Sequence, residues 1–103
     1  MAPKAKHTDR AVYIVWALWL IGMSEASIAS VVLKRRKQIA GIVTRSPYAN
    51  RSAMSKEGRQ AALDELLAVR MGEDGKPIDG GILDRVPHSV IDLQGRQRKR
   101  RDQ

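Results

Sequence analysis

The chain has no cysteine and no phenylalanine, and its 103 residues include only two Trp and two Tyr. The absence of cysteine excludes disulfide bonds and thiolate metal sites. With so few large aromatic rings, we expect one small domain with tails and a modest aliphatic core. The two histidines, His7 and His88, are isolated in the sequence and cannot form a metal centre by themselves.

Patterns of catalytic residues are lacking as well. The sequence contains no nucleophile beside a base, no glycine-rich phosphate loop that opens a helix, and no carboxylate cluster in apolar surroundings. We therefore expect a protein that is not an enzyme and that needs no metal or other cofactor.

No apolar run is long enough to cross a membrane. The most apolar stretch, AVYIVWALWLIGM at residues 11–23, falls short of the roughly 20 residues that a transmembrane helix needs. Basic residues before it and Ser24-Glu25-Ala26 after it would also suit a secretory signal peptide. Cleavage would discard most of the apolar residues, so we expect a cytoplasmic protein in which this stretch is the first helix.

Positive charge, in contrast, is abundant, and it is unevenly distributed. The net charge is +8, and residues 34–59 carry eight cations against one carboxylate. Residues 60–95 carry three cations against seven carboxylates, and residues 96–103 carry five against one. A focused positive field is typical of a nucleic-acid-binding protein, whereas a basic face that only aids solubility is the competing interpretation. We favour nucleic acid because the cations coincide with a helical motif.

That motif is a pair of short amphipathic segments in residues 24–45. Their apolar residues recur at helical spacing, as two crossing helices with a shared buried seam require: Ile28, Ala29, Val32, Ile39, Ile42 and Val43. The spacing predicts a helix-turn-helix unit, in which the second helix, at residues 34–46, presents its cations to the major groove of DNA.

Several of these residues resemble known regulators. The stretch from Trp19 to Ser24, the pair Ile28-Ala29 and the stretch from Arg36 to Arg45 are similar to GcrA-type helix-turn-helix regulators of alphaproteobacteria. The resemblance covers about the first half of the chain, and it implies a three-helix fold and a role in transcription. The turn position that is usually Gly is Leu33 here, so we expect a turn that is longer or differently wound.

The candidate DNA-binding residues lie on the second helix and in the loop after Pro47: Lys34, Arg35, Arg36, Lys37, Gln38, Thr44, Arg45, Tyr48, Asn50 and Arg51. Gln38 can pair with adenine and Thr44 can contact a thymine methyl group, whereas Lys37 and Arg45 are candidates for guanine. The remaining side chains would hold phosphates. For residues 48–51 an ordinary polar loop is an open alternative.

We therefore predict an all-α fold with a small three-helix helix-turn-helix domain, one further amphipathic helix and a mostly irregular C-terminal segment. Residues 1–9 form a basic arm, 10–53 the DNA-binding domain and 54–72 an amphipathic helix that serves packing or dimerisation. Residues 73–95 are an acidic segment that contains Gly and Pro. Four roles stay open for it: a linker, a segment that docks on the helices, a strand added to a partner, or a binding peptide. Residues 96–103 are a basic tail.

The predicted function is sequence-specific binding of double-stranded DNA by a bacterial or phage transcriptional regulator associated with the nucleoid. Its protein partners would be RNA polymerase or a sigma factor and a second copy of itself. Two alternatives stay open. One is a DNA-packaging factor similar to a phage small terminase, in which the later segments oligomerise, and the other is an interaction protein that binds RNA polymerase or RNA.

Overall fold

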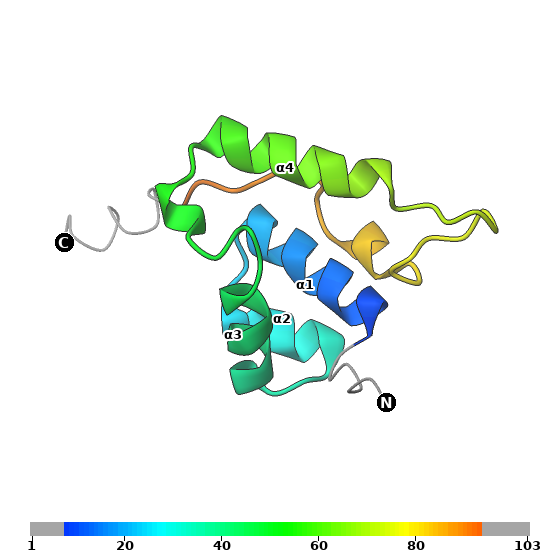
Figure 1. Cartoon of the computed structure of the whole chain (residues 1–103), viewed down its shortest axis with the longest axis horizontal. Helices are drawn as coiled ribbons and strands as arrows, with labels where there is room; N and C mark the ends of the chain where they lie inside the picture. Colours follow the sequence, from blue (N-terminus) through cyan, green and yellow to red (C-terminus); the bar gives the residue numbers. More distant parts are fainter. Residues whose placement is uncertain (1–7, 94–103) are drawn as a thin grey trace, which may run out of the picture.

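The computed structural model describes residues 8–93, which excludes almost all of the predicted basic arm and the whole basic tail. The predicted all-α fold is confirmed for the described residues, where the one β contact is an isolated bridge between Met71 and Pro77. The helices are α1 (Asp9–Ile21), α2 (Glu25–Val32), α3 (Arg36–Thr44) and α4 (Lys56–Ala68), with short 3-10 helices η1 (Arg51–Ala53) and η2 (Ile82–Arg85) (Figure 1).

Hydroxyl side chains define where three of the helices begin. The Oγ atoms of Thr8, Ser24 and Ser55 each accept a hydrogen bond from the main-chain N–H three residues later, at 3.1, 3.1 and 2.9 Å. These bonds satisfy N–H groups that have no partner within the helix. Gly22 closes α1 with a φ of 124°, a conformation that favours glycine. Short polar side chains and one glycine thus set these helix boundaries.

Two predicted boundaries were wrong. The cationic helix spans Arg36–Thr44 instead of residues 34–46, because Leu33 ends α2 and Lys34 and Arg35 form the turn. Helix α4 ends at Ala68 rather than at Gly72. The chain reverses there, and main-chain hydrogen bonds from Ile78 to Arg70 and from Gly72 to Lys76, at 2.7 and 2.8 Å, replace further helical turns.

Helix α1 lies in the middle of the molecule, with α4 along one side of it and α2 and α3 on the other (Figure 1). The core is aliphatic, as expected, and its fully buried side chains come from α1, α2, α3, α4 and η2: Val15, Leu18, Leu20, Ile28, Ile39, Leu63 and Leu83. Ile28 and Ile39 have no exposed surface, so the predicted seam between α2 and α3 is present.

The apolar stripe of α4 faces α1. Leu63 is fully buried and Leu66 is half-buried against the same core, while Met71, which lies beyond the end of the helix, is 58% exposed. The Tyr13 hydroxyl donates a hydrogen bond to the main-chain oxygen of Leu66 at 2.8 Å. Helix α4 therefore closes the side of α1 that α2 and α3 leave open.

The Gly- and Pro-containing segment that follows docks on the helices. Leu83 and Val90 are buried in the common core, and the Ile91 N–H donates to the Ile21 carbonyl at 2.8 Å. Of the interpretations that the sequence left open for residues 73–95, docking is therefore the one that the structure supports. Residues 94 and 95 lie outside the described part.

A buried ion pair organises this segment. The Asp79 side chain has no exposed surface, and its carboxylate accepts hydrogen bonds from Arg70 Nε at 2.6 Å and Arg70 Nη2 at 3.1 Å. The main-chain N–H groups of Gly81 and Leu83 also donate to it. Burial alone would raise the pKa of Asp79, but the hydrogen bonds from Arg70 and Leu83 outweigh it and hold the pKa at about 2.

The turn between α2 and α3 is strained. Leu33 adopts φ 59° and ψ 45°, the left-handed conformation that we expected a longer turn to avoid. This conformation costs a residue with a Cβ atom about 1–2 kcal/mol. Packing of Ile28 against Ile39 requires a tight turn between α2 and α3, and this turn holds Leu33 in the left-handed conformation.

Replacement of Leu33 by Gly should relieve that strain. We expect Leu33→Gly to raise the free energy of unfolding by about 1 kcal/mol, since the gain exceeds the extra chain entropy of glycine. Urea denaturation followed by circular dichroism measures the change. A lower midpoint for the variant would show that the Leu33 side chain stabilises the fold despite its backbone conformation.

The depressed pKa of Asp79 makes part of the stability dependent on pH. A carboxyl group whose folded pKa lies below its usual value of 3.8 stabilises the fold above that pH, and the contribution is lost as the pH falls towards about 2. Asp79→Asn should cost about 2 kcal/mol at neutral pH, and the difference from the wild type should shrink between about pH 4 and pH 2.

The matched control is Asp84→Asn. Asp84 pairs with the same guanidinium at 2.8 Å, but its side chain is 68% exposed, so its loss should cost less than about 1 kcal/mol. Equal destabilisation by the two substitutions would contradict the special role of the buried carboxylate. Thermal unfolding across this pH range provides both comparisons.

Candidate nucleic-acid interface

Helix α3 has one buried side and one outward side. Ile39, Ile42 and Val43 are buried against α2 and α1. On the opposite side, the spacing i, i+4 and i+7 aligns three residues in one row that points away from the core: Lys37, Gly41 and Thr44. This outward row is the part of α3 that another molecule can reach.

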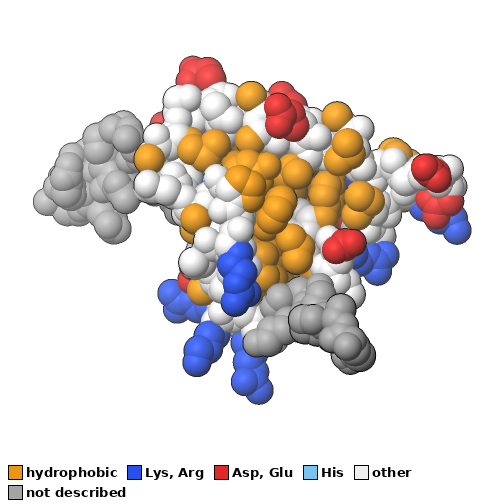
Figure 2. All heavy atoms as spheres, viewed as in Figure 1, with side chains coloured by type: hydrophobic (Ala, Val, Ile, Leu, Met, Phe, Trp, Pro, Cys, Tyr) orange, Lys and Arg blue, Asp and Glu red, His pale blue; other side chains and the backbone are white. Residues whose placement is uncertain are grey.

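Cations surround the outward row. Arg35, Arg36, Lys37 and Arg45 are exposed and Lys34 is half-buried, and we call these five residues the α3 cation cluster. Figure 2 shows Lys and Arg side chains gathered around the end of the molecule that α3 forms, whereas Asp and Glu lie mainly over α4 and the loop beyond it. No Asp or Glu occurs between Leu33 and Arg59 except Glu57. The positive field at α3 is thus not neutralised from within its own segment.

One member of the cluster has an acidic neighbour on α2. The Arg36 Nε atom lies 3.6 Å from Glu25 Oε1, and the two side chains are 73% and 30% exposed. Exposed pairs of this kind contribute little to stability and are screened by salt. Arg36 therefore stays available to an anion, with Glu25 holding it beside the first turn of α2. The spacing of Glu25 and Arg36 in the sequence does not predict this pairing.

Gln38 has a structural role in addition to the one we predicted. Its Oε1 atom accepts a hydrogen bond from the Arg35 N–H at 3.0 Å and so caps the first turn of α3. The capping is one-sided, because the guanidinium group of Arg35 has no acceptor atom. The Nε2 group of the exposed Gln38 side chain remains a donor, and Oε1 keeps one lone pair for a second hydrogen bond.

Gly41 leaves space along the outward row. A Cβ atom at this position would lie 3.9 Å from Arg45 Nη1, so the Arg45 side chain runs back along the helix over Gly41. Glycine inside a helix costs about 1 kcal/mol relative to alanine. In return, the backbone of α3 can approach a partner closely at this point.

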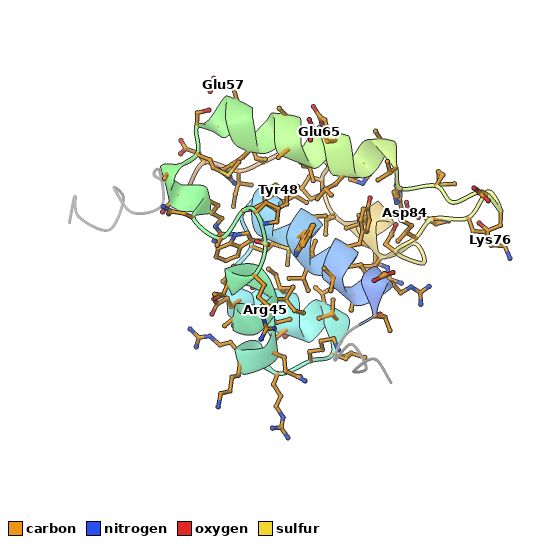
Figure 3. All side chains as sticks on the ribbon, viewed as in Figure 1. Arg45, Tyr48, Glu57, Glu65, Lys76 and Asp84 are labelled. Atoms are coloured by element: carbon orange, nitrogen blue, oxygen red, sulfur yellow. The ribbon has the colours of Figure 1, made fainter. Side chains whose placement is uncertain are left out.

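Two of the predicted loop residues, Tyr48 and Arg51, have structural roles that the sequence did not indicate, and their assignment as DNA contacts stays a prediction. Arg51 Nη1 donates to the carbonyl oxygens of Trp19 and Met23 at 2.6 and 2.9 Å, and its guanidinium lies 3.5 Å from the centroid of the Trp19 ring. The Tyr48 ring packs edge-on against Trp16, with the centroids 5.6 Å apart. Figure 3 shows Tyr48 against α1, away from the free end of α3. Both side chains hold the loop on α1.

Both interpretations of Asn50, as a DNA contact and as part of an ordinary polar loop, stay open. Its side chain is exposed, and Oδ1 accepts a hydrogen bond from the Ser52 hydroxyl at 3.3 Å. This bond belongs to an ordinary polar loop, and it leaves the amide group accessible to a phosphate.

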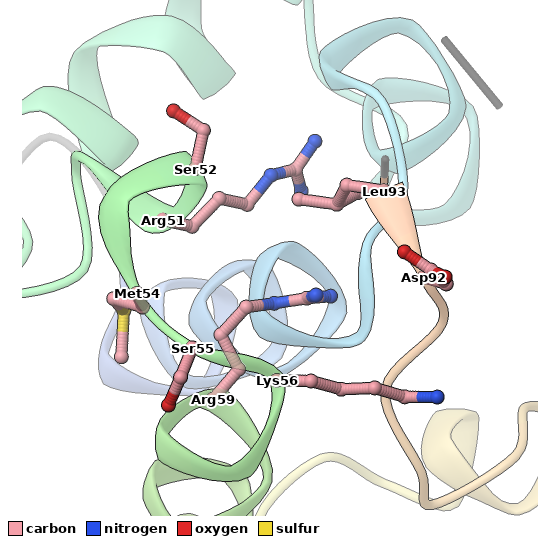
Figure 4. A pocket seen from close by; sticks show the side chains of 8 residues that line it. All are labelled: Arg51, Ser52, Met54, Ser55, Lys56, Arg59, Asp92 and Leu93. Carbon is pink, nitrogen blue, oxygen red and sulfur yellow. The ribbon is translucent and has the colours of Figure 1, made fainter. Parts of the chain in front are cut away.

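A second basic site lies at the N-terminal end of α4. Arg51, Lys56 and Arg59 line a pocket of about 460 Å³ together with Asp92 and Leu93 (Figure 4). Arg59 is only 3% exposed and donates hydrogen bonds to the main-chain oxygens of Leu20, Ile21 and Ile91. Arg51 and Arg59, two of the three cations in this pocket, therefore stabilise the fold. The positive charge that residues 34–59 offer to a ligand is smaller than their excess of cations suggests.

The described residues contain no group of acidic and histidine side chains that could hold a metal ion, and among them no helix is long and apolar enough to cross a membrane. Comparisons of the chain with models of known protein families, with curated proteins and with solved structures gave no match.

Proposed function

We propose that the protein binds double-stranded DNA with α3 in the major groove and acts as a transcriptional regulator of helix-turn-helix type. The observation that carries the proposal is the outward side of α3, which combines the α3 cation cluster with polar side chains and has no carboxylate. DNA-binding proteins of this kind use such a face to neutralise phosphates and to reach base edges.

The dimensions and the support of α3 suit this role. Helix α3 runs from Arg36 to Thr44, which at 1.5 Å per residue makes it roughly 13 Å long. With its side chains an α-helix is about 10–12 Å in diameter, which fits a major groove that is about 12 Å wide. The fully buried contact of Ile39 with the core holds α3 in place, so binding needs no folding of the helix.

The outward row supplies the base-reading side chains of the proposal. Lys37 can donate to the O6 and N7 atoms of guanine, and the Thr44 methyl group can contact thymine. Lys34 and Arg35 precede the helix, where side chains contact the phosphate backbone at the edge of the groove. A protein with these contacts acts in the nucleoid, next to the transcription machinery.

Neutral substitutions in the α3 cation cluster should test the phosphate contacts. Lys34→Ala and Arg35→Ala should each weaken binding to any duplex and lower the slope of log K against log salt concentration by roughly 0.9 per lost contact. Lys76→Ala is the matched control, because Lys76 is an exposed cation in the loop after α4 (Figure 3). Fluorescence anisotropy at several salt concentrations gives the slopes, and equal slopes for all variants would exclude α3 as the contact surface.

Gln38 should contribute to sequence discrimination through its free Nε2 donor. Gln38→Glu keeps an acceptor for the Arg35 N–H and so preserves the cap of α3, but it removes that donor. We compare a duplex selected from a random pool with a scrambled duplex. The difference between their binding free energies should fall by about 1–3 kcal/mol, because discrimination at one base pair is lost.

Both duplexes are titrated at the same salt concentration, because the added negative charge weakens binding to each of them. The informative quantity is the loss of binding free energy on the selected duplex minus the loss on the scrambled duplex. If the losses are equal, Gln38 only caps the helix and specificity resides elsewhere on α3.

A further inference from the structure

An apolar groove runs between α1 and α4 on the face shown in Figure 2, where hydrophobic side chains form a continuous patch. The groove has a volume of about 330 Å³ and is lined by Asp9, Val12, Tyr13, Trp16, Leu66 and Ile78. These residues belong to three separate parts of the chain that the fold brings together. None of them takes part in the proposed contact with DNA.

One of the residues that line the groove, Trp16, carries an unsatisfied polar atom. Trp16 Nε1 is buried, and among the buried side-chain nitrogen and oxygen atoms of the described residues it is the one without a hydrogen-bond partner. Buried indole N–H groups ordinarily have an acceptor. The Nε1 atom of the other tryptophan, Trp19, donates to the Tyr48 carbonyl at 2.8 Å. The Trp16 indole lines the groove, so its N–H signal reports on any molecule that binds there.

Carboxylates border the groove. Asp9 lines it directly, and Glu65 on α4 adjoins Leu66 (Figure 3). Glu65 also acts electrostatically on Tyr48, whose ring packs on Trp16. Two grooves facing each other would bring these carboxylates together, so a symmetric groove-to-groove dimer is unfavourable. The occupant should present an apolar side chain between cations.

The chain itself presents such a feature at the turn between α2 and α3. The Leu33 side chain is 89% exposed and sits on a strained left-handed backbone. Lys34 and Arg35 follow it directly. The tight turn projects the Leu33 side chain into solvent, where it can pack against another molecule.

We propose that the groove binds the α2–α3 turn of a second copy of this chain. Leu33 enters the groove of the neighbouring copy and packs against Trp16, with Lys34 and Arg35 beside Asp9 and Glu65. The contact joins two different surfaces, so it can repeat from copy to copy. Because one apolar side chain and two exposed ion pairs form it, we expect a dissociation constant of about 0.1–1 mM. The proposal does not depend on DNA binding, although DNA would compete for Lys34 and Arg35.

The two indole N–H signals make a dilution experiment decisive. In ¹H–¹⁵N spectra recorded from about 20 µM to 1 mM protein without DNA, a range that spans the expected dissociation constant, the Trp16 signal should shift with concentration. The Trp19 signal is the internal control, because its N–H is already hydrogen-bonded within the molecule. A Trp16 signal that does not change with concentration, or equal shifts of both signals, would overturn the proposal.

Leu33→Gly tests the other half of the contact without a risk to the fold, because glycine suits the backbone of this turn. The labelled variant alone should show no shift of the Trp16 signal. Unlabelled wild-type protein should restore the shift, since it supplies Leu33 to the intact groove, whereas unlabelled Leu33→Gly should not. A concentration-dependent shift in the variant alone would show that Leu33 is not the occupant.

Charge variants complete the test. Glu65→Lys should weaken the self-association at least threefold, whereas Glu57→Lys, which changes an exposed carboxylate at the other end of α4, should leave it unchanged (Figure 3). Equal effects of the two substitutions would point to general charge instead of the groove and would contradict the proposal.

Discussion

The arrangement of the helices depends on the buried guanidinium group of Arg59. It is 3% exposed and donates to the carbonyl oxygens of Leu20 and Ile21 at the end of α1, and to that of Ile91. The last carbonyls of a helix have no partner within it and carry partial negative charge, so a cation satisfies them well. Burial lowers the pKa of Arg59 and Asp92 opposes that shift, but an arginine stays charged in proteins. One side chain thereby joins α1, α4 and the C-terminal segment.

Arg51, in the loop after α3, also binds main-chain carbonyls near the end of α1. It donates to the Trp19 and Met23 carbonyls and stacks on the Trp19 ring. The two arginines fix the end of α1 from two directions, which places α2 and α3 on the side of α1 opposite α4 (Figure 1). The cations of residues 34–59 thus differ in their roles. Arg51 and Arg59 hold the scaffold, while the α3 cation cluster stays at the surface.

Local signals explain what could be predicted from the sequence. A hydroxyl three residues before a helical N–H, a glycine at a helix end and apolar residues at helical spacing act within a few residues, so Ser24, Gly22 and the Ile28–Ile39 seam could be identified. Arg59 has no such signal, because its partners are main-chain carbonyls that any residue carries. The conformation of Leu33 was missed because tertiary packing outweighs the preference of one residue for negative φ.

At the candidate site, too, some features follow from local sequence patterns and others depend on the tertiary structure. The outward row of α3 follows from the period of its buried side, so Lys37 and Thr44 could be assigned from the sequence alone. The cap made by Gln38 and the pairing of Arg36 with Glu25 depend on side-chain rotamers and on where α2 lies, which no periodicity specifies. Lys37 makes no contact that the fold needs, whereas Gln38 both begins the helix and faces solvent. If α3 binds DNA as proposed, binding and stability are separable at Lys37 and coupled at Gln38, because the carboxamide that would meet DNA also determines where α3 starts.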